Sequence, residues 1–328
     1  MTKVSIAMAT YNGAPYLREQ LESFITQTRR PDELIICDDV STDDTLIILE
    51  AFKKIAPFDV HTHVNKVNLG YAQNFSKALS LCSGDLVFLS DQDDVWFKDK
   101  IATLTEMAEK DSHNMVFMND AELTFEDLTP TGITMLTQYR SGGMSYDTFV
   151  LGCCAAIRGR FLKRILPVPI DYTHDRWIVE LADGLKRRCI TGETLQYYRR
   201  HGNNTSMSIT SKVQRLNKFR YYRRMILSSF KKGNRLSLRN RLQATVVLLE
   251  KVEQMLQMPI EGEDYGLRID LDKFSISLNW ELETLDLRVQ LTERPRLTRV
   301  AIAMKMLMDG RYSQNSGLKS ALLDIVRG

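Results

Sequence analysis

Three carboxylates within four positions follow directly after an apolar run in this chain. Residues 86–89 are apolar, and after Ser90 come Asp91, Asp93 and Asp94. Because side chains alternate along a strand, we expect Asp91 and Asp93 to point the same way where the strand ends. Two carboxylates held close together repel each other unless a cation lies between them, and Mg²⁺ and Mn²⁺ prefer oxygen ligands. The pattern predicts a divalent-metal site. The alternative is an acidic turn that caps a helix.

The elements that must position these carboxylates are predicted from the apolar periodicity of the first 110 residues. The expected strands are residues 4–10, 33–37, 60–64 and 85–89, and the expected helices are residues 15–27, 45–55 and 71–82. This alternation predicts right-handed β-α-β crossovers and a largely parallel sheet. Ligands of such sheets bind beyond the carboxyl ends of the strands, where two further polar clusters lie, at residues 10–13 and 38–44.

The rest of the chain has a different pattern. Residues 111–210 mix short apolar runs with glycines and one expected helix at residues 175–188. From residue 212 onward the apolar residues recur at helical spacing, apart from an expected loop at residues 259–272. The sequence therefore predicts an α/β region followed by a helical region.

Composition limits the class of protein. The chain has 328 residues, of which 44% are hydrophobic and 26% charged, as in soluble globular proteins. No apolar stretch approaches the roughly 20 residues that span a bilayer, and the first residues do not resemble a signal peptide. The five cysteines have neither a C-x-x-C pair nor zinc-site spacing, which favours reduced thiols in the cytoplasm. Residues 212–241 hold eleven Lys or Arg and no acid, although the net charge is only +3.

Several enzyme classes are excluded by missing motifs. No G-x-G-x-x-G follows the first expected strand, and neither G-x-x-x-x-G-K-[ST], H-E-x-x-H nor G-x-S-x-G occurs. Dinucleotide dehydrogenases, P-loop enzymes, zinc proteases and α/β-hydrolases are therefore disfavoured. A parallel sheet with polar strand ends and a carboxylate cluster suits a nucleoside diphosphate whose pyrophosphate lies on a metal.

Five segments in order resemble motifs of the inverting glycosyltransferases of GT-A family 2, most closely its rhamnosyltransferase-like members. These segments are residues 4–13, 31–45, 90–96, 173–177 and 198–204. The resemblance implies an α/β GT-A fold with a mostly parallel central sheet. It implies a catalytic domain at residues 1–210, with a nucleotide-binding half (1–110) and an acceptor half (111–210), before a helical region (211–328). Val40 stands where the family usually has a small residue, so we expect altered packing of that loop.

The resemblance also implies a role for each candidate site residue. Asp175 is the general base, and one base suffices because direct displacement forms no covalent intermediate. Asp93 and His201 are the expected ligands of Mn²⁺ or Mg²⁺. The expected nucleotide-binding residues are Thr10, Tyr11, Asn12, Asp39 and Asp91, and the residues expected near the diphosphate or the acceptor are Asp94, Arg176, Trp177 and Arg199.

Each role has a structural alternative. For Asp39 it is a turn residue ahead of the helix at residues 45–55, and for Tyr11 it is a packing aromatic. For Asp94 it is a helix cap. For Asp175 it is an acid favoured in a first helical turn by the helix dipole. A lone histidine such as His201 is usually structural.

The resemblance implies metal-assisted transfer of a sugar with inversion, in the synthesis of bacterial cell-surface polysaccharide. The expected donor is dTDP-rhamnose and the expected acceptor a lipid-linked saccharide. A UDP-hexose transferase and an inactive nucleotide-sugar-binding scaffold are the alternatives. A nucleotidyltransferase would usually need a glycine- and lysine-rich first loop, which residues 10–15 lack.

The basic segment, residues 212–241, leaves several partners open. It is a solvated helix face, a dimer interface, or a contact with anionic lipid at the inner face of the cell membrane. Binding of nucleic acid is disfavoured because the rest of the chain is acidic and carries no recognised motif. A cytoplasmic enzyme, peripheral on the membrane, is the expected localisation.

Overall fold

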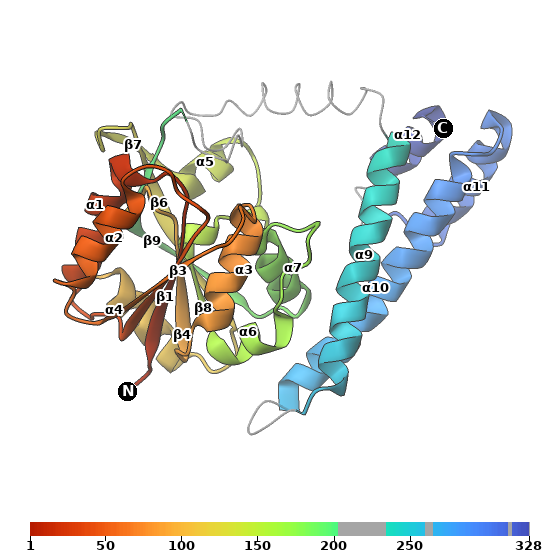
Figure 1. Cartoon of the computed structure of the whole chain (residues 1–328). Helices are drawn as coiled ribbons and strands as arrows, with labels where there is room; N and C mark the ends of the chain where they lie inside the picture. The colour runs from red at the N-terminus through yellow and green to blue at the C-terminus, as the bar shows by residue number, and fades with distance from the viewer. Residues whose placement is uncertain (203–233, 260–264, 314–316, 328) are drawn as a thin grey trace. The chain divides into compact units, whose positions relative to one another are not determined.

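A mixed nine-stranded sheet forms the centre of the first part of the chain in the computed structural model (Figure 1). The structure describes residues 1–202, 234–259, 265–313 and 317–327. The chain divides into two units, residues 1–221 and 222–328. The expected boundary near residue 210 lies outside the described residues, so the division into 1–210 and 211–328 stays a prediction.

The bounds of the elements are as follows. The strands are β1 Val4–Thr10, β2 Glu33–Asp38, β3 Asp59–Val64, β4 Leu86–Ser90, β5 Val95–Trp96, β6 Val116–Thr124, β7 Pro130–Thr134, β8 Ala155–Arg158 and β9 Arg188–Arg199. The helices of the first unit are α1 Ala14–Ile25, α2 Thr45–Lys53, α3 Tyr71–Leu81, α4 Lys100–Lys110, α5 Met135–Ser141, η1 Tyr146–Thr148, η2 Gly152–Cys154, α6 Gly159–Ile165 and α7 His174–Gly184. Those of the second unit are α9 Asn234–Gln257, α10 Tyr265–Leu291, α11 Arg296–Met308 and α12 Leu318–Arg327.

The four strands predicted in the first 110 residues are confirmed, and they pair in parallel in the order β3-β2-β1-β4. Helices α1, α2 and α4 cover one face of the sheet, and α3, α6 and α7 cover the other (Figure 1). Strands covered on both faces read as continuous apolar runs, which explains why β2 and β4 are buried along their whole length. The parallel arrangement brings the carboxyl ends of β1, β2 and β4 to one edge.

The second half of the sheet is mostly antiparallel. Strand β8 pairs antiparallel with β4 and β6, and β9 runs parallel to β6. The helix predicted at residues 175–188 ends four residues early, at Gly184. Lys186 has a left-handed φ of 56°, and Arg187 N donates to Ala182 O, so the chain turns out of the helix and enters β9. The predicted α/β fold followed by helices is nevertheless confirmed.

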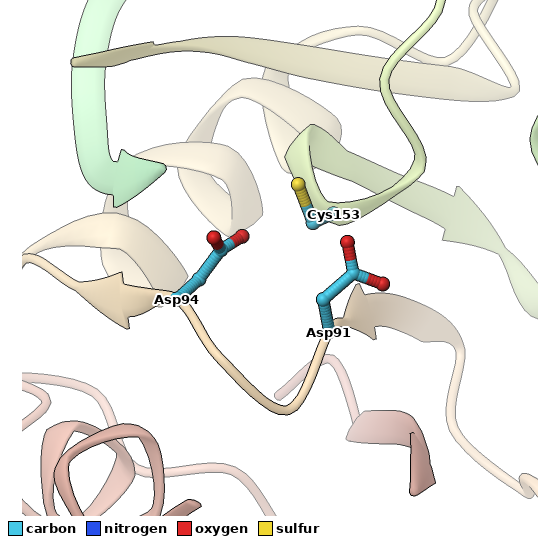
Figure 2. Close-up of side chains that lie close together, drawn as sticks. All are labelled: Asp91, Asp94 and Cys153. Carbon is cyan, nitrogen blue, oxygen red and sulfur yellow. The ribbon is translucent and has the colours of Figure 1, made fainter. Parts of the chain in front are cut away.

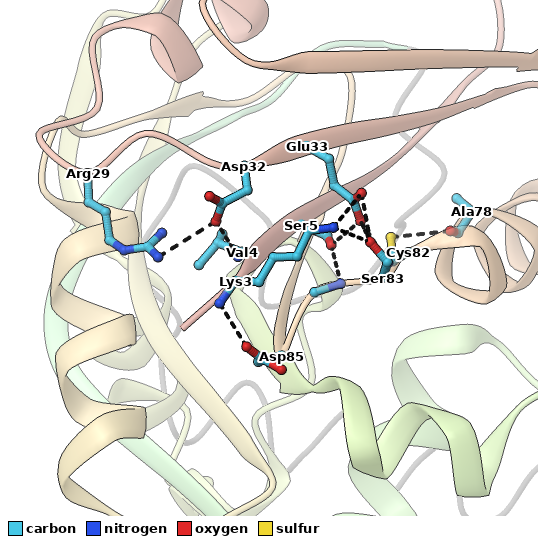
Figure 3. Close-up of polar contacts among 11 residues, drawn as sticks. Lys3, Val4, Ser5, Arg29, Asp32, Glu33, Ala78, Cys82, Ser83 and Asp85 are labelled. Carbon is cyan, nitrogen blue, oxygen red and sulfur yellow. Dashed lines mark hydrogen bonds and ion pairs between the residues drawn. The ribbon is translucent and has the colours of Figure 1, made fainter. Parts of the chain in front are cut away.

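The opposite edge of the sheet, at the amino ends of the strands, carries a closed polar network (Figure 3). Glu33 accepts hydrogen bonds from Ser5 Oγ at 2.5 Å and from Ser83 N at 2.7 Å, and Asp32 accepts one from Val4 N at 2.7 Å. Burial raises the pKa of Glu33, but the hydrogen bonds from Ser5 and Ser83 outweigh it and hold the pKa below its usual value. This edge joins β1, β2 and β4 through satisfied polar groups.

The second unit is helical over all of its described residues except short turns. The loop predicted at residues 259–272 is wrong from Tyr265 onward, because α10 begins there. Leu267, Leu271, Phe274 and Leu278 repeat at spacings of four and three and are buried, so the apolar face already starts inside the expected loop. None of the described helices combines the length and the apolar character that crossing a lipid bilayer requires.

Candidate active site

A cleft of about 730 Å³ opens where β1, β2 and β4 end. Its walls come from the loops after these three strands, the start of α3, η2, the start of α7, and the residues after β9. Eight of the predicted site residues line it, namely Thr10, Tyr11, Asn12, Asp39, Asp91, Asp93, Asp175 and His201. The structure thus brings together residues that are up to 191 positions apart, from Thr10 to His201.

The loops after β1 and β2 are tied to each other on one side of the cleft. Thr10 Oγ1 donates to Asp38 at 2.8 Å, which engages the hydroxyl that was expected to face the nucleotide. Asn12, at a left-handed φ of 47°, accepts from Thr42 N at 2.8 Å. Tyr11 is half exposed, and its ring is therefore open to a flat ligand. Of these three predicted residues, Tyr11 and Asn12 are exposed and Thr10 is buried.

Asp39 organises the loop ahead of α3. Its carboxylate accepts from Asn65 Nδ2 at 2.8 Å, Leu69 N at 2.7 Å and Gly70 N at 2.8 Å. The structural alternative predicted for Asp39 was a turn ahead of α2, but its side chain holds the loop ahead of α3 instead. The next residue, Val40, has a φ of 67°, a strained value for a β-branched side chain and one that suits glycine.

Gln92 joins the loop after β4 to the loop after β1, and sequence reasoning missed it. Its Oε1 accepts from Tyr11 N at 2.9 Å, and its Nε2 donates to Tyr11 O at 3.1 Å. A Cβ on Gly13 would lie 2.3 Å from the same Oε1, so a larger residue there would displace the Gln92 side chain. In the sequence, Gln92 is recognisable only as a polar residue between Asp91 and Asp93.

Asp91 and Asp94 lie near Cys153, and Figure 2 shows the three side chains converging from the loop after β4 and from η2. Their ligand atoms are all within 4.8 Å of one another. Strand β4 ends at Ser90, so the carboxylates that follow do not lie on a strand. The alternation of strand side chains therefore gives no reason for Asp91 and Asp93 to point the same way. Burial, together with repulsion from Asp93 and Asp175, raises the pKa of Asp91 to about 7.

Asp94 has a structural setting rather than an exposed one. It is fully buried and accepts from Gln196 Nε2 at 2.9 Å and from Arg199 N at 3.3 Å, which ties the loop after β4 to β9. Burial raises its pKa well above the usual value. Asp94 therefore has no exposed oxygen for the predicted contact with a diphosphate. Its carboxylate also does not cap the next helix, the predicted alternative, because it binds β9 instead.

A buried lysine beneath the carboxylates was also missed. Lys100 Nζ donates to Cys153 O at 2.7 Å and to Gln196 Oε1, and it lies 4.0 Å from the centre of the Trp96 ring. Burial lowers its pKa to about 8, while nearby Asp91 and Asp94 act in the opposite direction. A buried ammonium group thus compensates part of the negative charge of the cluster.

Asp93 and His201, the two predicted metal ligands, are brought into contact across 108 residues. His201 Nε2 lies 2.7 Å from Asp93 Oδ2, and the imidazole stacks on the Tyr16 ring at 4.3 Å between ring centroids. The Arg199 guanidinium also lies over the Tyr16 ring, 5.0 Å from its centre, and forms an ion pair with Glu19 at 3.2 Å. Arg199 is almost fully buried, so its contact with a diphosphate remains a prediction.

Asp175 stands in the first turn of α7 with its carboxylate at the cleft. Thr173 Oγ1 donates to Asp175 Oδ1 at 2.5 Å, and Arg176 N donates to the same oxygen at 2.7 Å. Within the described part of the chain, both hydrogen bonds to this carboxylate reach Oδ1. The other oxygen is therefore the one available to a substrate hydroxyl.

The two neighbours of Asp175 that were expected near the acceptor do not line the cleft. Trp177 is fully buried, and its Nε1 donates to Ile165 O at 2.9 Å, so its expected contact is corrected to a packing role. The sequence already indicated a packing role, because Trp177 shares the apolar helical face of Ile178 and Leu181. Arg176 points to solvent and pairs with Glu180 at 2.6 Å.

The comparisons with known proteins agree with this geometry. Residues 5–162 match the sequence profile of Glycosyl transferase family 2. Over these residues the chain is similar to family 2, and it is a glycosyltransferase. This glycosyltransferase is 43% identical over 99 residues to the dTDP-rhamnosyl transferase RfbG of Shigella flexneri, which covers 29% of this chain and 34% of that protein.

Two further relatives span more of the chain. It is 29% identical over 209 residues to the UDP-Glc:alpha-D-GlcNAc-diphosphoundecaprenol beta-1,3-glucosyltransferase WfaP of Escherichia coli, covering 63% of this chain and 80% of that protein. The crystal structure of S. aureus TarS 1–349 in complex with UDP-GlcNAc is similar in fold, with a TM-score of 0.54 and 16% identity over 99% of this chain and 89% of that one. This likeness supports the predicted GT-A fold.

His174 is a cleft residue that sequence reasoning left without a role. Its ring stacks on Phe75 at 4.0 Å between centroids and meets Tyr71 edge-on at 6.1 Å. It is almost fully buried, and its Nδ1 has no hydrogen-bond partner among the described residues. Burial lowers the pKa of His174 to about 4, so the imidazole is neutral at neutral pH.

This burial predicts a pH dependence of stability. Folding lowers the pKa of His174 from its usual value of about 6.5, so the folded state binds fewer protons than the unfolded state below pH 6.5. Its contribution to stability is therefore full above pH 6.5 and is lost as the pH falls to about 4, by up to about 3 kcal/mol. We expect urea unfolding to show a shallower loss between pH 7 and 4.5 in His174→Gln than in the wild type. His61→Gln, at an exposed histidine, should keep the wild-type slope, and an equal slope in both variants would contradict this prediction.

Gly152 is required by the packing between η2 and α7. A Cβ at this position would lie 2.9 Å from His174 Nε2 and 3.2 Å from Asp175 Cβ. We expect Gly152→Ala to lower the free energy of unfolding by about 1–3 kcal/mol, because the added methyl group overpacks the cleft wall. Gly192→Ala is the matched control, since no described atom lies within 4 Å of a Cβ there. Equal stability of the two variants in urea unfolding would refute the packing argument.

Proposed function

We propose that this glycosyltransferase moves a sugar from a nucleoside diphosphate to a saccharide hydroxyl, with inversion at the anomeric carbon. The observation that carries the proposal is the cleft at the carboxyl edge of the parallel strands. The cleft is lined by Asp39 and Tyr11, by Asp93 and His201, and by Asp175. A nucleoside, a diphosphate and an acceptor hydroxyl need a recognition site, a cation site and a base, and these three groups of residues can supply them.

The nucleoside is assigned to the loops after β1 and β2. The half-exposed Tyr11 ring is suited to stack on a base, and Asp39 lies beside it with a buried carboxylate fixed by three hydrogen bonds. A fixed carboxylate recognises base or ribose hydrogen-bond donors without having to order itself on binding. Thr10, Asn12 and Asp91 complete this proposed subsite.

The divalent cation is assigned to Asp93 and His201. Their donor set, a carboxylate oxygen and an imidazole nitrogen 2.7 Å apart, suits Mn²⁺ and is less suited to Mg²⁺, which prefers oxygen ligands throughout. Such a cation, when bound, neutralises charge that develops on a leaving diphosphate. Cys153 is a poor ligand by comparison, because burial raises the pKa of its thiol well above the usual value.

Asp175 is the proposed general base. Its Oδ1 is held by Thr173 and Arg176, which orients Oδ2 for the acceptor hydroxyl. The acceptor oxygen forms the new bond to the anomeric carbon, the bond to the diphosphate oxygen breaks on the opposite face, and the hydroxyl proton passes to Asp175. Asp91 and Asp175 line the same cleft, and after burial and Asp93, repulsion from Asp175 helps raise the pKa of Asp91.

The donor is proposed to be dTDP-rhamnose, and the second candidate is a UDP-hexose. The name of RfbG supports the first over 99 aligned residues, and the name of WfaP supports the second over 209. The diphosphoundecaprenol in the name of WfaP also supports a lipid-linked acceptor, polysaccharide synthesis, and work at the inner face of the membrane. The whole basic segment, residues 212–241, was expected to meet lipid, and residues 212–233 of it lie outside the described residues.

The test is a thermal-shift panel with dTDP-, UDP- and GDP-sugars, each with Mn²⁺ and with EDTA. A ligand of the folded state raises its stability by RT ln(1 + [L]/Kd), so the true donor should give the largest shift, and only with metal. Release of nucleoside diphosphate from that donor then separates an enzyme from an inactive scaffold. Absence of a shift with every sugar nucleotide would overturn the proposal.

A further inference from the structure

Tyr71 is a half-exposed aromatic residue in the wall of the cleft, and the proposed function does not use it. It is the first residue of α3 and is 46% exposed. Gly70, which precedes it at a positive φ of 77°, donates its N–H to Asp39 at 2.8 Å. This hydrogen bond fixes the backbone at the start of α3, so the Tyr71 ring is held at the cleft before any ligand arrives.

The Tyr71 ring meets the helix that carries the proposed base. It lies edge-on to the His174 ring, with 6.1 Å between centroids and 77° between planes, and His174 stacks on Phe75 at 4.0 Å. His174 is 5% exposed and directly precedes Asp175 in α7. The aromatic contacts between α3 and α7 therefore place the Tyr71 ring beside the first turn of α7.

Charge and packing also connect this place with Asp175. Burial raises the pKa of Tyr71, and the negative charge of Asp175 raises it further. Gly152 of η2 adjoins the same turn, since a Cβ there would lie 2.9 Å from His174 Nε2 and 3.2 Å from Asp175 Cβ. Tyr71, Gly152 and Asp175 all line the cleft. The proposed base thus lies between a residue without a side chain and a half-exposed aromatic ring.

An aromatic ring near a proton acceptor suits a sugar. An acceptor hydroxyl must come within about 3 Å of the base to give up its proton, so the sugar ring that carries it lies over the cleft wall beside Asp175. A sugar ring presents C–H groups on its faces and hydroxyls at its edge. The face of an aromatic ring carries partial negative charge and attracts such C–H groups, while the hydroxyls stay free for hydrogen bonds.

We propose that Tyr71 is the platform on which the acceptor sugar stacks while its hydroxyl faces Asp175. The inference rests on the proposed function, because it takes Asp175 as the base and a saccharide as the acceptor. The competing ligand is the nucleobase of the donor, since Gly70 is bonded to Asp39. Tyr11, the ring assigned to the nucleobase, is 50% exposed and is tied through its backbone to Gln92. The two half-exposed tyrosines of the cleft therefore serve different substrates.

Steady-state transfer to methyl glycosides of glucose, galactose, rhamnose and N-acetylglucosamine tests the proposal, with the donor that the thermal-shift panel identifies. Tyr71→Ala should raise the KM for the acceptor about three- to tenfold and leave kcat nearly unchanged, because stacking acts equally in the ground state and the transition state. Tyr71→Phe retains the ring and should retain the wild-type KM. Phe125→Ala is the matched control, at a ring that is 49% exposed and outside the cleft, and it should keep both constants.

The thermal shift with the sugar nucleotide separates the acceptor from the donor. It should stay at the wild-type value in Tyr71→Ala and fall in Tyr11→Ala. A fall in Tyr71→Ala would overturn the inference and assign this ring to the nucleotide.

Three further results would count against a stacked acceptor sugar. A wild-type acceptor KM in Tyr71→Ala would exclude the contact, and a raised KM in Tyr71→Phe would show that the hydroxyl rather than the ring binds. A lowered kcat with unchanged KM would make Tyr71 a residue that positions the base. Tyr71→Leu, which keeps apolar volume without a ring, gives the same test where Tyr71→Ala does not fold. Each of these results requires transfer by the wild type, whereas absence of that transfer would contradict the proposed function itself.

Discussion

Replacement of Asp175 by Asn is expected to lower the turnover number for glycosyl transfer about 10²- to 10⁴-fold, because the acceptor hydroxyl loses its proton acceptor. The amide can still accept from Thr173 and from Arg176 N, so the first turn of α7 should keep its geometry. Donor binding, measured as the thermal shift with the sugar nucleotide, should stay near the wild-type value. The rate is measured as release of nucleoside diphosphate with and without acceptor.

The control for this experiment is Asp171→Asn, at an exposed carboxylate outside the cleft, which should keep wild-type turnover. Full transfer by Asp175→Asn would show that the base has been misassigned. Loss of donor binding along with turnover would instead mean that Asp175 supports the cleft rather than the proton transfer.

Replacement of Asp93 by Asn is expected to lower the rate about 10²- to 10³-fold at limiting Mn²⁺, because the leaving diphosphate loses the charge that stabilises it. His201→Gln should have a similar effect. The double variant should transfer at about the rate of either single variant, since both residues act on the same ion. EDTA should abolish transfer by the wild type, and Mn²⁺ should restore it. Titration of activity with Mn²⁺ measures the effect.

The two candidate metal sites predict different controls. If the ion lies at Asp93 and His201, Cys153→Ala should leave the Mn²⁺ dependence unchanged, and Asp94→Asn should lower stability through its contacts with Gln196 and Arg199 rather than metal affinity. A weakened Mn²⁺ dependence in Cys153→Ala, with none in Asp93→Asn, would move the ion to the cluster of Asp91, Asp94 and Cys153.

The first half of the fold could be predicted because its strands are buried on both faces. Such strands read as nearly continuous apolar runs, and residues 34–37 and 86–89 therefore stand out without any partner being known. The end of α7 could not be placed in the same way. Helices often end at a glycine in the left-handed conformation, but here Lys186 adopts that conformation. The start of α10 was missed although Leu267 and Leu271, inside the expected loop, already belong to its buried face.

The candidate site was predictable only where local pattern or family resemblance reached it. The carboxylates after β4 were visible in the sequence, but the pairing of Asp93 with His201 depends on how β9 returns to the cleft, and only the resemblance pointed to it. Lys100, Gln92 and His174 act through contacts between distant segments, and no local pattern marks such residues. Sequence spacing also could not show that Asp94 faces inward.

The closed network of Glu33, Ser5 and Ser83 has a practical consequence for handling the enzyme. It lies at the start of β1, and the cleft lies at the other end of that strand, about 20 Å away for seven residues. A surface linker attached ahead of Val4 would therefore emerge on the far side of the sheet from the cleft. Immobilising the molecule in this orientation should leave room for acceptors that are large or embedded in vesicles.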